Sequence, residues 1–277
     1  MKICDWMRSA KEQLTDNERP HRDLEILLER VTGKPRAWLI AFYDSPLTPY
    51  MLNTLQQLVA RRAAGEPIAY LTGEREFWSL PLKVTPDVMI PRQDTEILVE
   101  EALKYLSKTT NNSILDLGTG NGAIALAIAS ERKDCHILGV DCIDSIIKLA
   151  KQNALNLGIT NVSFILGKWF STIKKHKFSM IVSNPPYIDK TDNHLLTGDL
   201  RFEPKNALIS ENNGLADITF IIQEAKKHLT PGGWLLLEHG WNQATIIQKL
   251  MSIHKFSKIK TSQDYGGNDR VTSGKSH

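Results

Sequence analysis

The hydrophobic positions of the first 65 residues recur at the spacing of α-helices. Two stripes stand out, formed by Leu24, Leu27, Leu28 and Val31 and by Met51, Leu52, Leu55, Leu58 and Val59. Apolar side chains three and four positions apart lie on one face of a helix, so each stripe predicts an amphipathic helix. Breaks at Gly33-Lys34-Pro35 and Ser45-Pro46 separate the helices. We therefore predict a small domain of about four helices over residues 1–68.

Short runs of β-type residues replace this pattern between Tyr70 and Pro91. Two such runs cover residues 76–78 and 82–84, and Ser79-Leu80-Pro81 between them is typical of a turn. We predict a β-hairpin there, within a linker of residues 69–91 that connects two domains.

The rest of the chain, residues 92–277, alternates apolar runs with helical patterns after a helix predicted over residues 95–106. Strands are predicted at residues 113–117, 136–140, 162–166, 178–182 and 234–238, and helices are expected to begin near Gly122, Asp144, Asp217 and Trp241. Strands joined by crossover helices predict an α/β fold, a doubly wound and mostly parallel sheet with ligands at the carboxyl ends of its strands. Shorter runs at 257–260 and 270–272 are expected to form a hairpin at the edge.

Composition and charge narrow the class of protein. The chain has 277 residues, 42% of them hydrophobic and 23% charged, enough for one α/β core and a smaller domain. Its net charge is +3, and the basic clusters at 174–177 and at Lys255, Lys258 and Lys260 are short. Such clusters are typical of solvated lysines, so we expect no stable complex with nucleic acid.

The amino-terminal residues and the cysteines indicate where the protein works. The first thirty residues contain no apolar run long enough for a signal peptide or a membrane span. Cys4, Cys135 and Cys142 are an odd number without CxxC spacing, which predicts neither a disulfide framework nor a metal site. We expect a cytoplasmic protein without a membrane partner.

Three glycines mark the point where a predicted strand turns into a predicted helix. Gly118 permits the turn, Gly120 lets a ligand approach the backbone, and Gly122 lets helix and strand pack closely. The same spacing occurs in dinucleotide-binding folds, so the glycines alone do not identify the ligand.

Two acidic residues at strand ends discriminate between the possible ligands. Asp116 lies two residues before Gly118, where a carboxylate would oppose a phosphate but favour the cationic α-ammonium group of S-adenosylmethionine. Asp141 closes the second strand, where a carboxylate can accept both ribose hydroxyls. The alternative is that both acids only cap helices. We interpret them as one site for the cofactor S-adenosylmethionine.

The tetrapeptide Asn184-Pro185-Pro186-Tyr187 follows the strand predicted at residues 178–182. An amide nitrogen is a poor nucleophile because its lone pair is delocalised, so an enzyme has to orient it rather than supply a strong base. The side-chain carbonyl of Asn184 and the backbone carbonyl of Pro185 are two acceptors that fit one NH₂ group. Tyr187 would lie against the flat face of that group. Such positioning can supply roughly 7–11 kcal/mol of a barrier.

The tetrapeptide leaves two alternatives open. It could be only a rigid turn that ends a strand. As a site, it could hold a side-chain amide. It could also hold the exocyclic amine of a flipped adenine, and the protein would then be an adenine-N6 DNA or RNA methyltransferase. The balanced charge of the chain argues against a nucleic-acid methyltransferase. A cofactor-sensing module without activity would have no need of two aligned acceptors.

Together these residues resemble the HemK/PrmC family, the protein-(glutamine-N5) methyltransferases that modify peptide chain release factors. The resemblance extends over nearly the whole chain and includes residues 90–96, 202–204, 207–208, 233–240 and 268–271. It implies transfer of a methyl group to the side-chain amide of the glutamine in the release factor's Gly-Gly-Gln loop. It also implies that the helical domain helps to hold this protein substrate. We expect a monomer.

The resemblance also implies a set of site residues. The cofactor would contact Gly118, Thr119, Gly120, Asn121, Gly122, Asp141, Trp169 and Asn184, and the substrate glutamine would contact Asn184, Pro185, Pro186 and Tyr187. Lys168 departs from the family, which commonly has an acid there that could bind the adenine amino group. Gln93 replaces a proline of the family. A paralogous methyltransferase of a ribosomal-protein glutamine would share these residues.

Two further residue sets have interpretations that the sequence leaves open. Arg92 and Glu96 lie one helical turn apart, so they could pair with each other or reach the ligand crevice. His239 ends a predicted strand and could suggest a general base, but methyl transfer to an amide does not require one, so a structural role is expected.

Overall fold

The computed structural model describes residues 1–14, 19–106, 112–174 and 176–277, and these form two compact units. The first unit consists of Met1–Glu74 and Leu196–Phe202, and the second of Arg75–Leu195 and Glu203–His277. The short segment Leu196–Phe202 belongs to the first unit although it is far from it in sequence. Arg201 anchors this segment with a hydrogen bond from its Nη2 to the carbonyl oxygen of Ala64. The domain limits drawn from the sequence, at residues 68 and 91, stay predictions.

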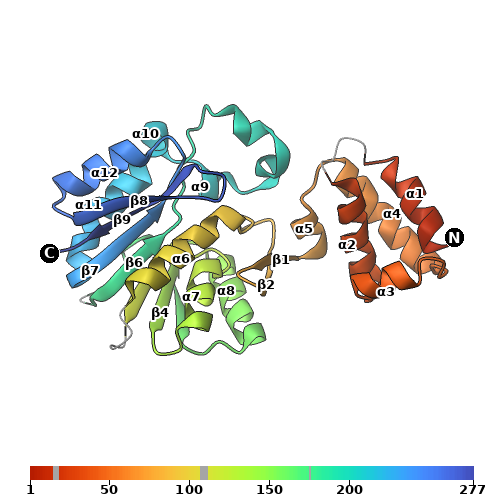
Figure 1. The fold of residues 1–277 in the computed structure, drawn as a ribbon, viewed down its shortest axis with the longest axis horizontal. Coiled ribbons are helices and arrows are strands. Elements are labelled where there is room, and N and C mark those ends of the chain that lie inside the picture. The colour runs from red at the N-terminus through yellow and green to blue at the C-terminus, as the bar shows by residue number, and fades with distance from the viewer. Residues whose placement is uncertain (15–18, 107–111, 175) are drawn as a thin grey trace. The chain divides into compact units, whose positions relative to one another are not determined.

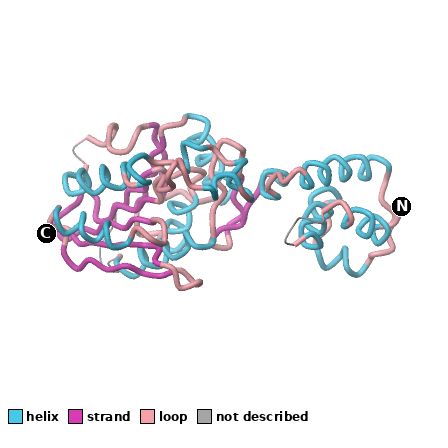
Figure 2. The backbone as a smooth tube through the Cα atoms, turned by 90° about the horizontal axis from the view of Figure 1, so that it is seen from above, coloured by secondary structure: helices cyan, strands magenta, loops and turns pink. Residues whose placement is uncertain are grey.

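The first unit is built of helices that bury their apolar stripes against one another. Its helices are α1 (Ile3–Lys11), α2 (Pro20–Thr32), α3 (Arg36–Ala41), α4 (Pro49–Ala63) and α5 (Ile68–Thr72). The residues Leu24, Leu27 and Leu28 of α2 and Leu55 and Val59 of α4 are at most 1% exposed, which confirms the two predicted stripes. Figure 2 shows this unit as helices joined by loops.

A fifth helix in the first unit corrects the prediction of about four. Helix α5 occupies residues that the sequence assigned to a β-type linker. Pro67 precedes it and Gly73 ends it with a left-handed φ of 74°. A helix of one turn has too few residues to show a period, so only these two punctuating residues could have indicated it.

The second unit contains a seven-stranded sheet in the order β5-β4-β3-β6-β7-β9-β8 (Figure 1). Its strands are β3 (Ser113–Leu117), β4 (His136–Asp141), β5 (Val162–Leu166), β6 (Phe178–Ser183), β7 (Leu229–Glu238), β8 (Ser257–Gln263) and β9 (Asp269–Lys275). The first five in this order pair in parallel, and β9 runs antiparallel to both of its neighbours. This confirms the predicted doubly wound, mostly parallel sheet and its edge hairpin.

Helices cover both faces of this sheet. On one face α6 (Glu96–Tyr105), α7 (Ala123–Glu131) and α8 (Asp144–Leu157) pack on a core that includes Met180 and Val182 of β6. On the other face α11 (Ala216–His228) and α12 (Ala244–Ile253) pack on a core that includes Ile181. Side chains alternate along β6 between the two cores, as the period of a strand requires.

Short elements complete the second unit. The hairpin strands β1 (Glu74–Phe77) and β2 (Leu80–Lys83) form a separate two-stranded sheet. The remaining elements are one-turn helices, η1 (Gln93–Thr95), η2 (Asn193–Leu196), η3 (Gly198–Phe202), α9 (Lys205–Leu208) and α10 (Glu211–Gly214), of which η3 and the last residue of η2 belong to the first unit.

Three predicted boundaries in the second unit are wrong by a few residues. The hairpin turn consists of Trp78 and Ser79, with φ of 53° and 58°, rather than residues 79–81. A two-residue turn with both φ positive matches the twist of the flanking strands. Strand β7 begins at Leu229 rather than Trp234, across a Pro-Gly-Gly sequence that usually signals a turn. Helix α12 begins at Ala244, after the turn that contains Trp241.

Within the described parts of the chain, no helix is both long and apolar enough to cross a membrane. The lysines of the two basic clusters are exposed where they are described, and Lys175 lies outside the described residues.

Candidate active site

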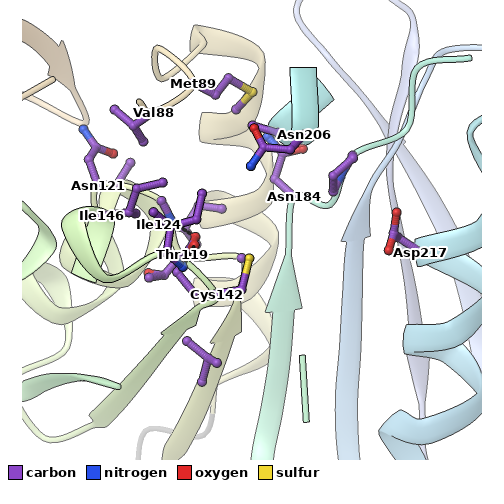
Figure 3. Close-up of a pocket in the computed structure, with 18 of the residues that line it drawn as sticks. Val88, Met89, Thr119, Asn121, Ile124, Cys142, Ile146, Asn184, Asn206 and Asp217 are labelled. Atoms are coloured by element: carbon purple, nitrogen blue, oxygen red, sulfur yellow. Dashed lines mark hydrogen bonds between the residues drawn. The ribbon is translucent and has the colours of Figure 1, made fainter. Parts of the chain in front are cut away.

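A cavity of about 360 Å³ opens at the carboxyl ends of β3, β4 and β6 in the second unit. Figure 3 shows Thr119, Cys142 and Asn184 at these strand ends, with Val88 and Met89 on a preceding loop. The volume falls within the range of small-molecule sites. Of the residues predicted for the site, the cavity is lined by Gly118, Thr119, Gly120, Asn121, Asp141, Trp169, Asn184 and Pro186. The others, Asp116, Gly122, Pro185 and Tyr187, are not among its lining residues.

The glycine-rich turn forms the floor of the cavity. Gly118, Gly120 and Gly122 all have positive φ, at 69°, 56° and 88°. A Cβ on Gly122 would lie 3.0 Å from the Phe164 ring and 3.1 Å from Leu126, which agrees with the close packing predicted for this glycine. The ring of Trp169 packs over Gly118, since a Cβ there would lie 3.4 Å from ring atom Cζ3. The turn therefore requires glycine for its conformation and for its neighbours.

Asp141 joins the glycine turn to the end of β4. Its Oδ2 accepts a hydrogen bond from the backbone N–H of Gly120 at 3.1 Å, and its Oδ1 accepts one from Ile143 at 3.2 Å. An ionised carboxylate has about four acceptor positions, so each oxygen can accept one more hydrogen bond. Burial raises the pKa of Asp141 above its ordinary value, and these backbone hydrogen bonds oppose that shift. The carboxylate has the chemistry needed to hold two hydroxyl groups.

Asp116 lies behind the cavity wall and is fully buried. Its Oδ2 accepts a hydrogen bond of 2.6 Å from the hydroxyl of Thr119, which does line the cavity. Burial raises the pKa of Asp116 to about 7, while hydrogen bonds from Thr119 and the backbone of Ala125 act in the opposite direction. A positive charge in the cavity would stabilise the ionised form. Whether Asp116 touches a ligand directly stays a prediction.

Asn184 of the tetrapeptide 184–187 lines the cavity and carries one unpaired acceptor. The Nδ2 group of Asn184 donates to Thr95 Oγ1 at 3.3 Å, whereas its Oδ1 is buried and has no hydrogen-bond partner among the described residues. A buried carbonyl oxygen without a partner costs about 1–3 kcal/mol. A ligand with an N–H group would recover that free energy. Tyr187 donates from its hydroxyl to Glu238 Oε1 at 3.3 Å.

Several residues near the cavity were not assigned from the sequence. Thr95, Val88 and Asn206 line it, and Glu238 accepts the hydrogen bond of the Tyr187 hydroxyl. They come from separate parts of the second unit: Val88 from a loop, Thr95 from η1 before α6, Asn206 from α9 and Glu238 from the end of β7. Only the fold therefore reveals them. Thr95 and Glu238 lie in segments that resemble the HemK/PrmC family, residues 90–96 and 233–240, which was the one available signal, whereas Val88 and Asn206 lie outside those segments.

Arg92 and Glu96 do not pair with each other, so that sequence-based alternative is wrong. Arg92 forms a salt bridge with Glu203, whose side chain is fully buried and also accepts from the backbone N–H of Ile90 at 3.3 Å. Glu96 accepts from the backbone N–H of Trp78 at 2.9 Å. Neither residue lines the cavity. Arg92 and Glu203 instead connect the loop that carries Pro91 with the start of α9, which carries Asn206 to the wall.

His239 and Lys168 have clear placements. The His239 ring is buried and faces the carbonyl oxygen of Gly240 at 2.9 Å and the hydroxyl of Thr272 at 2.7 Å, as expected of a structural residue. Lys168 is exposed and borders the cavity beside Trp169. Within the described residues, no three His, Cys, Asp or Glu side chains gather where they could hold a metal ion.

Comparison with protein families gives two matches. Residues 108–272 match the model of a methyltransferase domain, and residues 5–73 match the model of the PrmC N-terminal domain. The first match covers more than half of the chain.

Curated relatives agree over the full length. The chain is 53% identical to the release factor glutamine methyltransferase of Salmonella typhimurium, over 98% of this chain and 97% of that one. It is 50% identical to the protein of the same name from Escherichia coli K12, over 99% of both chains. Among solved structures, a methyltransferase from Pyrococcus furiosus matches with a TM-score of 0.55 and 16% identity, over 78% of this chain and 96% of that one. The last likeness shows a shared methyltransferase fold.

Proposed function

Because the chain belongs to the family of release factor glutamine methyltransferases, we propose that it methylates the side-chain amide of a glutamine in peptide chain release factors. The substrate is the glutamine of the Gly-Gly-Gln loop, and the products are N5-methylglutamine and S-adenosylhomocysteine. The observation that carries the proposal is that Asn184 lines the cavity while its buried Oδ1 atom has no partner among the described residues.

S-adenosylmethionine fits the acidic and glycine-rich part of the cavity. The two oxygens of Asp141 would accept the ribose hydroxyls, in addition to the backbone groups that they already bind. Gly118 and Gly120 let the ligand approach the backbone, and Trp169 offers its ring beside the adenine. The raised pKa of Asp116 also supports this cofactor, because a buried carboxylate behind Thr119 is stabilised by a cationic ligand.

The substrate amide fits the other end of the same cavity. Asn184 Oδ1 would accept one hydrogen of the glutamine NH₂ group, and the backbone carbonyl of Pro185 would accept the other. Neither acceptor removes the proton before transfer. They fix the plane of the amide so that the nitrogen faces the methyl group.

The reaction balances without a strong base. When bound, S-adenosylmethionine supplies a methyl group on a positively charged sulfonium. The nitrogen–carbon bond forms as the carbon–sulfur bond breaks, so the positive charge passes from sulfur to the substrate nitrogen. That nitrogen then loses one proton to water and recovers the planar amide. The chain's contribution is to hold the amide nitrogen in line with the methyl group.

A labelling experiment tests the proposal. The protein is incubated with methyl-labelled S-adenosylmethionine and, in separate reactions, with a purified release factor, a ribosomal-protein mixture and duplex DNA. We expect label in the release factor alone, on the Gly-Gly-Gln peptide after digestion. Label confined to DNA or to a ribosomal protein would overturn the substrate assignment.

Substitution of Asn184 tests the role of the tetrapeptide in the same assay. Asn184→Ala removes one of two acceptors, and we expect kcat to fall by roughly 100-fold with the cofactor affinity nearly unchanged. Asn156→Ala is the matched control, because Asn156 lies exposed on α8 away from the cavity. Normal turnover by Asn184→Ala would contradict the proposed role.

A further inference from the structure

Glu238 and Asn184 meet at the carboxyl edge of the sheet. They directly follow the last paired residues of the adjacent parallel strands β7 and β6. Side chains alternate along a strand, so Glu238 points to the same face as Leu236, and Asn184 to the same face as Val182. Leu236 and Val182 both belong to the core packed under α6. The two polar side chains therefore meet at the beginning of that helix, beside Thr95.

Two hydroxyl groups converge on the Glu238 carboxylate, which is only 1% exposed. Tyr187 donates to its Oε1 at 3.3 Å. The Oε2 atom of Glu238 is buried and has no hydrogen-bond partner among the described residues, and the neighbouring hydroxyl of Thr95 lowers the pKa of this carboxyl group. An ionised carboxylate can only accept hydrogen bonds, so both hydroxyl protons are directed toward Glu238.

This arrangement determines which way the Asn184 amide faces. A threonine hydroxyl has one proton, and once Glu238 accepts it the oxygen can act only as an acceptor. The group that faces that oxygen is the Nδ2 of Asn184, at 3.3 Å. With its nitrogen held by Thr95, the Asn184 side chain leaves Oδ1 without a partner among the described residues. Oδ1 is the atom that can accept from a substrate amide.

We propose that Glu238 is a positioning residue that, through Thr95, holds Asn184 with its carbonyl oxygen toward the substrate nitrogen. The inference rests on the proposed function, because it explains how the Asn184 side chain that would bind the substrate amide is oriented. A protonated Glu238 would no longer need the Thr95 proton, which could then be donated to Asn184 Oδ1. The amide would turn over and present an NH₂ group to the cavity. An NH₂ group cannot accept a hydrogen bond from a substrate NH₂ group.

The charges around Glu238 make this arrangement sensitive to pH. Burial and, to a smaller extent, the nearby Asp94 raise the pKa of Glu238, whereas Thr95, Arg270 and Tyr187 lower it, and the net result is a pKa of about 7. Arg270 is itself held by Asp264 at 2.9 Å and Asp94 at 3.6 Å. Arg92 and Arg270 also face Tyr187 and lower the pKa of its hydroxyl, while burial and Glu238 raise it. The carbonyl oxygen of Asn184 is therefore held toward the substrate above neutral pH, and this orientation is lost as the pH falls through the pKa of Glu238.

Four variants test the inference against the wild type. Glu238→Gln imitates the protonated side chain, Glu238→Asp keeps the charge, and Thr95→Val removes only the hydroxyl. Glu101→Gln is the matched control, since Glu101 is a buried glutamate of α6 that pairs with Lys104 at 2.9 Å and does not line the cavity. For each protein, kcat and KM with the release factor are measured from about pH 5.5 to about pH 8.5, together with cofactor affinity and thermal unfolding.

We expect Glu238→Gln and Thr95→Val to lower kcat by roughly 10- to 100-fold, the range for a hydrogen bond to a charged group. Cofactor affinity should stay close to that of the wild type. The acidic limb of the kcat profile should disappear in Glu238→Gln and return in Glu238→Asp. Glu101→Gln should keep the wild-type profile. A wild-type pH profile in Glu238→Gln, or a loss that follows thermal stability alone, would overturn the inference.

A measurement on the free enzyme separates this inference from the proposed function. The side-chain NH₂ of Asn184 is observed by nitrogen-15 NMR and assigned by its absence in Asn184→Ala. Its resonance should shift with pH in the wild type and stay constant in Glu238→Gln, whatever the substrate. If the release factor is not methylated but this shift is present, the substrate assignment fails and the role of Glu238 stands. A resonance in the wild type that does not respond to pH overturns the role of Glu238.

Discussion

The polar residues of the cavity differ in what the fold leaves them to do. Asp141 has two backbone partners and acceptor positions to spare, whereas Asn184 has one partner on its nitrogen and none, among the described residues, on its oxygen. If all hydrogen-bond positions of the carboxylate were used, it would only cap the turn, and an amide with all positions used would only end the strand. The acceptor positions that remain free on these oxygens suit hydroxyl and amide donors. The alternatives of a helix cap and a rigid turn therefore account for only part of each residue's contacts.

Lys168 is the residue whose replacement should improve the site. A lysine cannot accept a hydrogen bond from the adenine amino group, and the Lys168 side chain is exposed at the cavity edge. Lys168→Asp places an acceptor there, and we expect about three- to tenfold tighter binding of S-adenosylmethionine, the usual worth of one net hydrogen bond. Isothermal titration calorimetry measures the affinity.

Lys168→Met is the control for this prediction, because it removes the positive charge near Cys142 without adding an acceptor. The gain should be larger for aspartate than for methionine. Equal affinities of the two variants would mean that a backbone carbonyl already serves the adenine amino group.

At the scale of elements, strand register is what assembles the site. Leu117, the last residue of β3, pairs with Val140 of β4 and with Ser183 of β6, so the residues that follow the three strands emerge at one edge. The glycine turn crosses to β4, where the backbone N–H groups of Gly118 and Thr119 both donate to Val140 at 2.9 and 3.0 Å. A shift of one residue in any of these pairings would turn the side chains to the opposite face.

Two glycines that begin or end helices allow a matched test of the turn. Gly122 has a φ of 88° before α7 and contacts Phe164 and Leu126, whereas Gly158 has a φ of 64° after α8 with open space around it. An alanine in the left-handed conformation costs about 1–2 kcal/mol at either position. We expect Gly158→Ala to lower the free energy of unfolding by that amount only.

Gly122→Ala should cost more, because its methyl group must also displace the Phe164 ring or the Leu126 side chain. We expect an additional loss of about 1–3 kcal/mol, typical of overpacking, and weaker cofactor binding. Urea unfolding measures the first effect and calorimetry the second. Equal costs for the two variants would show that the packing at Gly122 relaxes freely.

Prediction from the sequence succeeded where the signal was local. Strands β3 to β6 were located to within one residue because each is a compact apolar run bounded by turns. The start of β7 was missed because Pro231, Gly232 and Gly233 signal a turn, yet they form an irregular strand end that exchanges hydrogen bonds with Ser276. Helix α5 was missed because one turn shows no period.

The residues of the site also divide into those that the sequence signals locally and those that it does not. The glycine turn, Asp141 and Asn184 have short motifs, and the structure gathers these around one cavity. Thr95 and Glu238 have no local signal, since one begins a helix and the other ends a strand, like many residues of their type. Their meeting depends on the pairing of β6 with β7 and on the packing of α6 over both. Only the assembled fold contains that information.

At the scale of the whole molecule, the second unit buries two carboxyl groups whose pKa values are raised to about 7, Asp116 and Glu238. A group with a raised pKa binds its proton more tightly in the folded protein than in the unfolded chain. Its contribution to stability is therefore present at low pH and is lost as the pH rises through 7. The lowered pKa values of Glu25, Asp134 and Asp264 concern titrations below about 4.5, so these groups contribute equally throughout the neutral range.

A cationic cofactor and a proton should have opposite effects on Asp116, because the cofactor favours the ionised carboxylate and the proton neutralises it. S-adenosylmethionine favours the ionised form of Asp116, so binding requires the carboxyl group to lose its proton. Below pH 7 we expect the cofactor affinity to fall by up to roughly tenfold for each pH unit, because the α-ammonium group of the ligand stays charged there. The increase in unfolding temperature caused by the cofactor should shrink accordingly between about pH 7 and about pH 6.

Asp116→Asn isolates this effect from the histidines that titrate in the same range. Burial lowers the pKa of His228 and His239, so both can change the stability of the ligand-free protein with pH. The variant retains an acceptor for Thr119 but has no proton to lose. Its cofactor affinity should be weaker at pH 7 and nearly constant down to about pH 6, where the wild type approaches it. Parallel curves for the two proteins would show that Asp116 does not sense the charge of the ligand, and that its carboxylate serves only to hold Thr119 in the turn.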